Sequence, residues 1–414
     1  MEIEIGRGKK ARRAYGFDDI AIVPSRRTRD PDDVDISWTL GPYRFEIPLL
    51  ASAMDGVVSP ETARIIGKLG GLAVLNLEGI WTRYEDAGAQ LERIAQLPKE
   101  VATREMQAIY QEPIKPELIR RRIEQIKAEP GVVVAASLTP QRVRRYCDLA
   151  LDAGLDIMVI QGTVVSAEHV SEHTTPLNLK EFIADLPVPV VVGGCASYQT
   201  GLHLMRTGAA GVLVGVGPGA ACTTRGVLGL GVPQATAIAD VAGARSTHML
   251  ETGEYVQVIA DGGMRTGGDV SKAIACGADA VMIGSPLARA YEAPGRGFHW
   301  GMATFHPSLP RGARVQTIQN GTIEQILKGP AHENDGTFNL MGALRTSMAT
   351  TGYKDLAEFN RAELMIAPAL QTEGKLLQAA QQVGMGSRGA AASAHPGAAD
   401  GNGVQDKTPA LSEA

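Results

Sequence analysis

Eight short runs of apolar and β-branched residues recur along the chain, and helix-favouring stretches separate them. The runs begin at Ile47, Gly71, Gly131, Ile157, Val188, Gly211, Val256 and Ala280. Most are continuously apolar instead of alternating, which is typical of strands buried on both faces of a parallel sheet. Parallel strands joined by helices need right-handed crossovers, and eight such units predict a closed TIM (β/α)8 barrel. An open doubly wound sheet is the alternative.

The composition is that of an ordinary globular protein, because 44% of the 414 residues are hydrophobic and 21% are charged. A chain of this length can bury a large core without a metal or a disulfide. We predict one barrel domain over residues 1–383. Residues 384–414 are rich in Ala, Gly, Ser and Pro, which predicts a disordered tail. Residues 81–130, between the second and third runs, are charged and favour helices.

Charge and cysteine content exclude several classes of protein. The four cysteines have neither a zinc spacing nor a secreted framework, which indicates free thiols in a reducing compartment. The N-terminus has no apolar signal region, and no run of about 18 apolar residues occurs, so we expect a cytoplasmic protein without a membrane partner. A net charge of -5 argues against nucleic acid as a partner, and we interpret the basic run Arg7–Arg13 as a solvated arm.

Two glycine-rich loops follow the last two predicted strands. The segment DGGMRTGGD, Asp261–Asp269, follows the seventh run, and GSPL follows the eighth from Gly284. Such barrels bind phosphate at these two loops, where glycines leave backbone N–H groups bare. Asp261 is then placed to accept hydrogen bonds from sugar hydroxyls. The alternative is that the glycines only form tight turns.

A cysteine follows the sixth predicted strand, on the same rim of the barrel. Cys222 lies in GVGPGAACTTR, where glycines and a proline break the strand into a loop. Bare backbone N–H groups can lower the pKa of a thiol, and a thiolate attacks electrophilic carbon. Thr224, two residues on, could orient a water or assist a leaving group. The alternative is a small buried residue at a strand end.

Three other kinds of site have weaker support. The segment HVSEH, His169–His173, matches a metallohydrolase pattern, but no further ligand is evident and we predict no metal site. GVGPGA resembles a dinucleotide-binding loop with Asp240 at the expected distance, yet Asp240 falls within a helical stretch instead of at a strand end. An FMN-dependent barrel would use the same phosphate loops.

Long ordered motifs cover nearly the whole chain except the tail: YGFDDIAIVPS, SAMD, GPGAACTTR, GVPQATAIAD, IADGGMRTGGDVSKAIACGADAVMIGSPLA and LMGALRTSMATTGY. The chain resembles the IMP dehydrogenase/GMP reductase family, which implies a TIM barrel that binds a purine mononucleotide and adds a cysteine to C2 of the base. The resemblance implies that Cys222 is the nucleophile and Thr224 its neighbouring active-site threonine. It further implies that Asp261 binds the ribose and that the phosphate is bound by Gly263, Gly284 and Ser285. The purine-site residues that it implies are Ser52, Met54, Gly301 and Met302. The cofactor-site residues that it implies are Gln161, Gly162 and Thr163.

The chain departs from the family pattern at several positions. Ala220 replaces a serine two residues before the nucleophile, Gln161–Thr163 replace an Asp-Ser-Ser triplet, and Gly194 replaces an asparagine. After Thr304 no Arg-Tyr pair follows, which weakens the dehydrogenase assignment, and Phe305 stands where the reductase has its glutamate. Arg311 and Arg314 are candidate substitutes, with surface charge as the alternative role.

The resemblance favours a GMP reductase that uses NADPH, because the chain is compact and lacks the CBS insertion common in IMP dehydrogenases. An NAD-dependent IMP dehydrogenase is the alternative, and a non-catalytic purine-nucleotide sensor is the third. The resemblance also implies a homotetramer or homo-octamer and allows K+ at the Gly217–Cys222 loop.

Overall fold

The computed structural model describes residues 2–172, 176–302, 312–367 and 374–384. It divides into two units, Met1–Leu370 and Gln371–Ala414. In the second unit the described part contains the helix α15, Lys375–Gln381. The predicted tail, 384–414, lies outside the described residues apart from Gly384, so the boundary at residue 383 stays a prediction.

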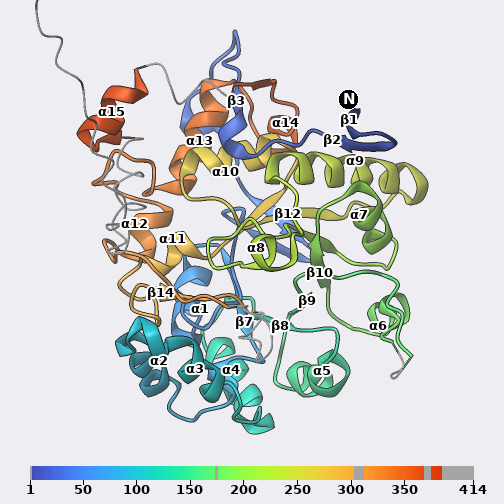
Figure 1. The fold of residues 1–414 in the computed structure, drawn as a ribbon, viewed down its shortest axis with the longest axis vertical. Helices are drawn as coiled ribbons and strands as arrows, with labels where there is room; N and C mark the ends of the chain where they lie inside the picture. Colours follow the sequence, from blue (N-terminus) through green and yellow to red (C-terminus); the bar gives the residue numbers. More distant parts are fainter. Residues whose placement is uncertain (1, 173–175, 303–311, 368–373, 385–414) are drawn as a thin grey trace, which may run out of the picture. The chain divides into compact units, whose positions relative to one another are not determined.

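The first unit is built on a closed barrel of eight parallel strands (Figure 1). In chain order the strands are β6 (Leu49–Ala51), β7 (Leu72–Asn76), β8 (Ala135–Leu138), β9 (Ile157–Gln161), β10 (Val190–Cys195), β11 (Gly211–Val214), β12 (Gln257–Asp261) and β13 (Ala280–Ile283). Each strand pairs with the next, and β13 closes the barrel on β6 with Met282 opposite Leu50. The predicted TIM barrel is confirmed, and the open doubly wound alternative is wrong.

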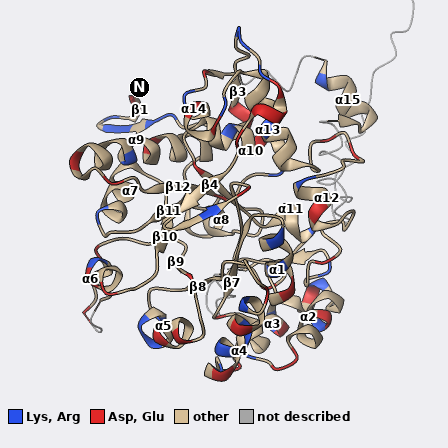
Figure 2. Cartoon of the chain, turned by 180° about the vertical axis from the view of Figure 1, so that it is seen from behind, with Lys and Arg blue, Asp and Glu red and all other residues tan. Residues whose placement is uncertain are grey.

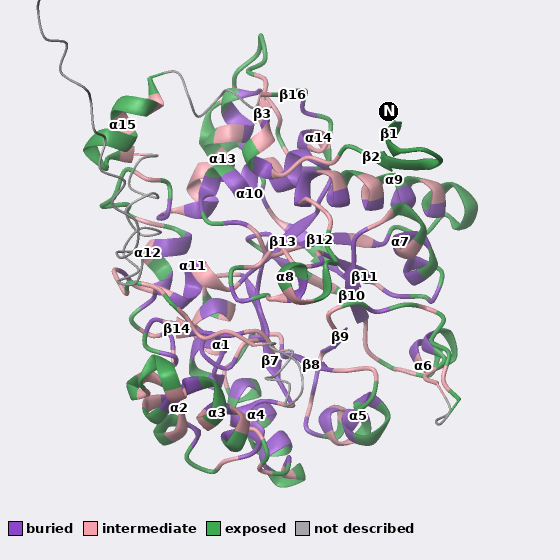
Figure 3. Ribbon diagram, viewed as in Figure 1, coloured by how far each residue is buried: buried purple, intermediate pink, exposed green. Residues whose placement is uncertain are grey.

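The barrel strands are buried because helices cover them from outside. All six residues of β10 and all four of β13 are buried, as the continuously apolar pattern predicts (Figure 3). The covering helices are α1 (Pro60–Lys68), α4 (Pro116–Lys127), α5 (Val143–Asp152), α6 (Leu179–Ala184), α7 (Tyr198–Met205), α9 (Gln234–Thr252) and α10 (Gly267–Ala275). Lys, Arg, Asp and Glu positions lie mainly on helices and loops (Figure 2).

A helical outgrowth, residues 80–127, stands between β7 and β8 at the bottom of Figure 1. It consists of η3 (Ile80–Thr82), α2 (Ala87–Gln96), α3 (Lys99–Ile109) and α4. Charged residues alternate with apolar ones at helical spacing in α2 and α3, so each helix buries one face. The helices expected over residues 81–130 are confirmed.

Short elements complete the first unit. The strands β1 (Glu2–Gly6) and β2 (Lys9–Arg12) form a hairpin; further antiparallel pairs join β3 (Ile20–Ile22) to β16 (Leu364–Ile366), β4 (Trp38–Leu40) to β5 (Tyr43–Phe45), and β14 (Phe298–His299) to β15 (Val315–Gln316). The remaining helices are η1 (Phe17–Asp19), η2 (Pro31–Asp33), α8 (Thr224–Leu228), α11 (Ser285–Ala288), α12 (Ile323–Leu327), α13 (Leu340–Thr350) and α14 (Leu356–Phe359).

The basic run that the sequence analysis interpreted as an arm lies in the hairpin of β1 and β2, and its Arg12 donates to Asp240 at 2.6 Å. Within the described ranges, no helix has the length and apolarity that crossing a bilayer requires.

A buried ion pair joins α9 to the start of β13. Arg245 Nη1 donates to Asp279 Oδ2 at 2.6 Å, and both side chains are 10% exposed. Replacing Arg245 by leucine is expected to destabilise the fold by about 3 kcal/mol, because the buried Asp279 carboxyl loses its counter-charge. The matched control is Arg206→Leu, which breaks a surface pair with Glu251 and should cost about 0–1 kcal/mol. Urea unfolding of both variants measures the difference, and equal losses would contradict the prediction.

Candidate functional site

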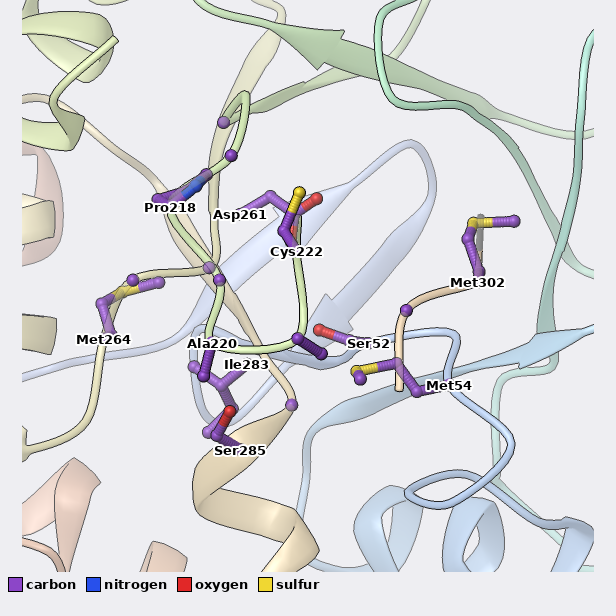
Figure 4. Close-up of a pocket in the computed structure, with 18 of the residues that line it drawn as sticks. Ser52, Met54, Pro218, Ala220, Cys222, Asp261, Met264, Ile283, Ser285 and Met302 are labelled. Atoms are coloured by element: carbon purple, nitrogen blue, oxygen red, sulfur yellow. The ribbon is translucent and has the colours of Figure 1, made fainter. Parts of the chain in front are cut away.

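A cavity of about 510 Å3 opens at the carboxyl ends of the barrel strands (Figure 4). This size falls within the ~300–1,000 Å3 typical of small-molecule sites. The loops that follow β6, β9, β11, β12 and β13 line it, together with residues 301–302 and Gly312. The carboxyl ends of parallel strands meet at one face, which is why residues distant in the sequence converge there.

Twelve of the thirteen predicted site residues line this one cavity: Cys222, Asp261, Gly263, Gly284, Ser285, Ser52, Met54, Gly301, Met302, Gln161, Gly162 and Thr163. Thr224 does not line it. The predicted nucleophile, ribose, phosphate, purine and cofactor positions therefore share a single space.

Cys222 is distinguished from the other cysteines by its surroundings. It is exposed and lies on the cavity wall, whereas Cys147, Cys195 and Cys276 are buried free thiols. Burial raises the pKa of Cys195 to about 12 and that of Cys276 to about 12, so both stay protonated and inert at neutral pH. Cys222 is the cysteine that a ligand in the cavity can reach.

The loop before Cys222 lies tightly against β12. A Cβ on Gly215 would stand 2.1 Å from the carbonyl oxygen of Asp261, so only glycine permits this approach. The loop then turns, and the Cys222 N–H donates to the Gly219 carbonyl at 3.0 Å. The glycine-rich sequence thus brings the cysteine to the same cavity as Asp261.

Thr224 contacts Cys222 but does not line the cavity. Its side chain is fully buried at the start of α8, and the Cys222 thiol donates to its Oγ1 at 3.2 Å. The hydroxyl therefore faces the Cys222 sulfur. A hydroxyl can both accept and donate, so Thr224 can also donate a hydrogen bond to the sulfur. Thr223, which the sequence analysis did not single out, lines the cavity next to Cys222.

Asp261 ends β12 and has a perturbed carboxyl group. Desolvation raises its pKa to about 7, opposed by a hydrogen bond from Gln161. Gln161 Nε2 donates to Asp261 Oδ2 at 3.1 Å. The side chain of this predicted cofactor residue is thus engaged with the predicted ribose ligand, across 100 positions of sequence.

A histidine that the sequence analysis missed supports the loop after β13. His299 is fully buried and shares a hydrogen bond with Ser285 Oγ at 2.8 Å. Burial lowers the pKa of His299 to about 4, so the ring is neutral at physiological pH and can hold the serine hydroxyl without adding charge. The sequence feature that could have identified His299 is its position two residues before Gly301, a predicted purine-site residue.

Arg265 and Asp18 are further cavity residues that the sequence analysis did not predict. They form an ion pair of 3.2 Å, and their side chains are 53% and 57% exposed. The position of Arg265 inside the glycine-rich loop, two residues after Gly263, was the available signal. The pair links the wall of the cavity to the N-terminal segment.

Arg314 is half-buried and is held by the outgrowth. Its guanidinium donates to the carbonyls of Ile94 and Leu97 and lies 4.3 Å from the centre of the Phe298 ring. Two of its donors bind carbonyls at the end of α2, and its catalytic role stays a hypothesis. Arg311, Phe305 and His173 lie outside the described residues.

No group of three or more His, Cys, Asp or Glu side chains in the described ranges could hold a metal ion. The fold and the cavity define a TIM-barrel protein with an exposed cysteine at its C-terminal face, where proteins of this fold carry their active sites.

Comparison with known proteins identifies the family to which the chain is similar. Residues 14–376 match the model of the IMP dehydrogenase / GMP reductase domain. An uncharacterised oxidoreductase of Mycolicibacterium smegmatis is 48% identical over 88% of this chain and 99% of its own length. The inosine-5'-monophosphate dehydrogenase of Methanocaldococcus jannaschii is 26% identical over 88% of this chain and 95% of its own length. The crystal structure of an IMP dehydrogenase/GMP reductase-like protein from Corynebacterium glutamicum superposes with a TM-score of 0.84 at 45% identity, covering 88% of this chain and 97% of the other.

The chain belongs to the IMP dehydrogenase/GMP reductase family and is an oxidoreductase of that family. The resemblance inferred from the motifs is confirmed.

Proposed function

We propose that this protein is a nicotinamide-dependent oxidoreductase that acts at C2 of a purine mononucleotide through a covalent adduct with Cys222. The observation that carries the proposal is the exposed thiol of Cys222 in the same cavity as Asp261 and the two glycine-rich loops. The family supports oxidoreductase chemistry on such nucleotides.

The cavity offers a group for each part of the nucleotide. The backbone at Gly263 and Gly284 and the hydroxyl of Ser285 bind the phosphate, with His299 holding that hydroxyl. The carboxylate of Asp261 accepts hydrogen bonds from the ribose hydroxyls. Ser52, Met54, Gly301 and Met302 surround the purine.

The reaction begins when the Cys222 thiolate adds to C2 and forms a carbon–sulfur bond. The Thr224 hydroxyl, which accepts from the Cys222 thiol at 3.2 Å, can donate to the thiolate in turn and keep the sulfur oriented. A nicotinamide bound in the cavity would supply or accept the hydride at C2. Gln161, Gly162 and Thr163 line the same cavity as Cys222 and would contact that ring. These three residues suit a nicotinamide ring because none of them is charged. Gln161 stands where the family has a carboxylate, and its amide donates to Asp261.

IMP dehydrogenase is the direction we propose, with NAD as oxidant, because a named relative that spans nearly the whole chain is an IMP dehydrogenase. In this direction C2 loses hydride, and water then cleaves the carbon–sulfur bond to release XMP. GMP reductase with NADPH, which the sequence analysis favoured, is the second candidate. The observation behind it is the compact chain, in which only the helical outgrowth separates β7 from β8.

The test mixes the purified protein with IMP and NAD, and separately with GMP and NADPH, and follows the absorbance of the reduced nicotinamide. Each assay is run in K+ and in Na+, because the resemblance allows K+ at the Gly217–Cys222 loop. Formation of NADH with IMP is the expected result. Loss of NADPH with GMP supports the reductase instead. No change in either assay, with tight nucleotide binding, indicates a sensor and contradicts the proposal.

A cytoplasmic location and assembly as a homotetramer or homo-octamer complete the proposal and rest on the sequence and the resemblance. Light scattering of the purified protein measures the assembly directly.

A further inference from the structure

The core of the helical outgrowth contains a residue from the edge of the cavity. Ile80, Leu91, Ile94, Met106 and other outgrowth residues form a buried cluster. Trp300 belongs to this cluster and is 1% exposed, although it lies outside the outgrowth in the sequence. The two residues that follow Trp300, Gly301 and Met302, line the cavity.

Hydrogen bonds run from Trp300 to a second wall of the cavity through Tyr110. Trp300 Nε1 donates to Tyr110 Oη at 2.6 Å, and Tyr110 Oη donates to Asp55 Oδ2. Asp55 directly follows Ser52, Ala53 and Met54, which line the cavity. Ser52–Met54 form one part of the cavity wall, here called the 52–54 wall, and Gly301–Met302 form another, the 301–302 wall. The Tyr110 hydroxyl, which belongs to the outgrowth, connects the residues next to these two walls.

Asp55, the last acceptor in this series of hydrogen bonds, is buried and contacts the outgrowth backbone. It is 2% exposed, and its Oδ2 also accepts from the Ile80 N–H at 2.9 Å. A Cβ on Gly79 would stand 1.9 Å from Asp55 Oδ1, so the backbone of the outgrowth lies directly against the carboxylate. Burial raises the pKa of Asp55 to about 6, which leaves the group ionised as an acceptor at neutral pH.

The 301–302 wall has a second attachment to the outgrowth. The Arg314 guanidinium packs on the Phe298 ring and donates to Ile94 and Leu97 carbonyls of the outgrowth. Phe298 itself packs against the buried cluster. The outgrowth therefore contacts the segment before Gly301 through both apolar and polar groups.

We propose that Tyr110 is a positioning residue that sets the spacing of the two purine-side walls, Met54 and Gly301–Met302, through its bonds to Asp55 and Trp300. This inference rests on the proposed nucleotide site. The side-chain hydrogen bonds of Tyr110 described above go to Asp55 and Trp300, which adjoin the purine-side walls, so we expect its effect to fall on the base and not on the phosphate.

The test compares Tyr110→Phe with Tyr84→Phe. Tyr84 is the matched control because it lies in the same outgrowth and its hydroxyl donates to the Ile109 carbonyl at 2.8 Å, within the outgrowth. Calorimetry measures the affinity of each protein for IMP and for ribose 5-phosphate. Losing the Tyr110 hydroxyl removes the acceptor of Trp300 Nε1 and one of the two hydrogen bonds to Asp55 Oδ2, and we expect IMP to bind about tenfold more weakly. Ribose 5-phosphate should bind as it does to the wild type.

The control variant should bind both ligands within about twofold of the wild type, even if its thermal midpoint falls. Unchanged IMP affinity in Tyr110→Phe overturns the inference. An equal loss for ribose 5-phosphate also overturns it, because that result indicates a general structural defect. If wild-type protein binds neither IMP nor GMP, the proposed function fails as well, and the wild-type titration alone reveals this.

Discussion

Replacing Cys222 by alanine is expected to lower turnover by about 10³-fold or more while IMP affinity stays within about threefold of the wild type. The thiolate forms the bond to C2, and no other exposed cysteine exists to replace it, since the other three are buried. Nucleotide binding depends on the phosphate loops and Asp261, which the substitution leaves in place. Turnover assays and calorimetry on the same preparation separate the two effects.

Cys147→Ala is the control, because it removes a thiol that is buried against the core and should affect stability only. Acid quenching followed by mass measurement should find a nucleotide adduct on the wild type and none on the Cys222 variant. Turnover within tenfold of the wild type after loss of Cys222 would contradict the covalent mechanism.

Nucleotide affinity should fall as the pH is lowered through about 7, because burial raises the pKa of Asp261 to about 7. Above this pH the carboxylate accepts hydrogen bonds from both ribose hydroxyls. Below it the protonated group accepts fewer, and affinity falls by up to about tenfold per pH unit. Calorimetry from pH 5.5 to 8.5 measures the profile.

The phosphate group also titrates, with a second pKa near 6, so a control must isolate Asp261. Asp261→Asn should bind about tenfold more weakly at high pH and retain only the phosphate dependence. Gln161→Leu removes the amide that donates to Asp261 and opposes the raised pKa, so its midpoint should move upward. An identical profile in wild type and Asp261→Asn would show that Asp261 does not control binding.

The barrel was predictable because its signal is local and repeated. Runs such as residues 188–194 and 256–263 are largely apolar over the length of one strand and contain turn residues at their ends. The structure places β12 within the second run, and β10 begins in the first and ends one residue beyond it, at Cys195. Parallel topology then brings the residues after each strand to one face. For this reason Cys222, Asp261 and Ser285 could be assigned to one cavity from the sequence.

Side-chain partners were not predictable, because they depend on how elements far apart in the sequence pack. Gln161 matched a cofactor position, yet it donates to Asp261. Thr224 faces the sulfur of Cys222 because α8 begins there and buries its side chain. Arg314 is turned to the carbonyls at the end of α2, which no local pattern indicates.

The sequence by itself determined the order of strands and helices, the loops that carry chemistry and the family, since short-range periodicity and ordered motifs encode all three. Only the tertiary structure decided which groups share hydrogen bonds, as in the connection from Trp300 through Tyr110 to Asp55. Those partners are 190 and 55 positions apart. A buried polar group takes whichever partner the packed elements bring within reach, because leaving it unpaired costs about 1–3 kcal/mol.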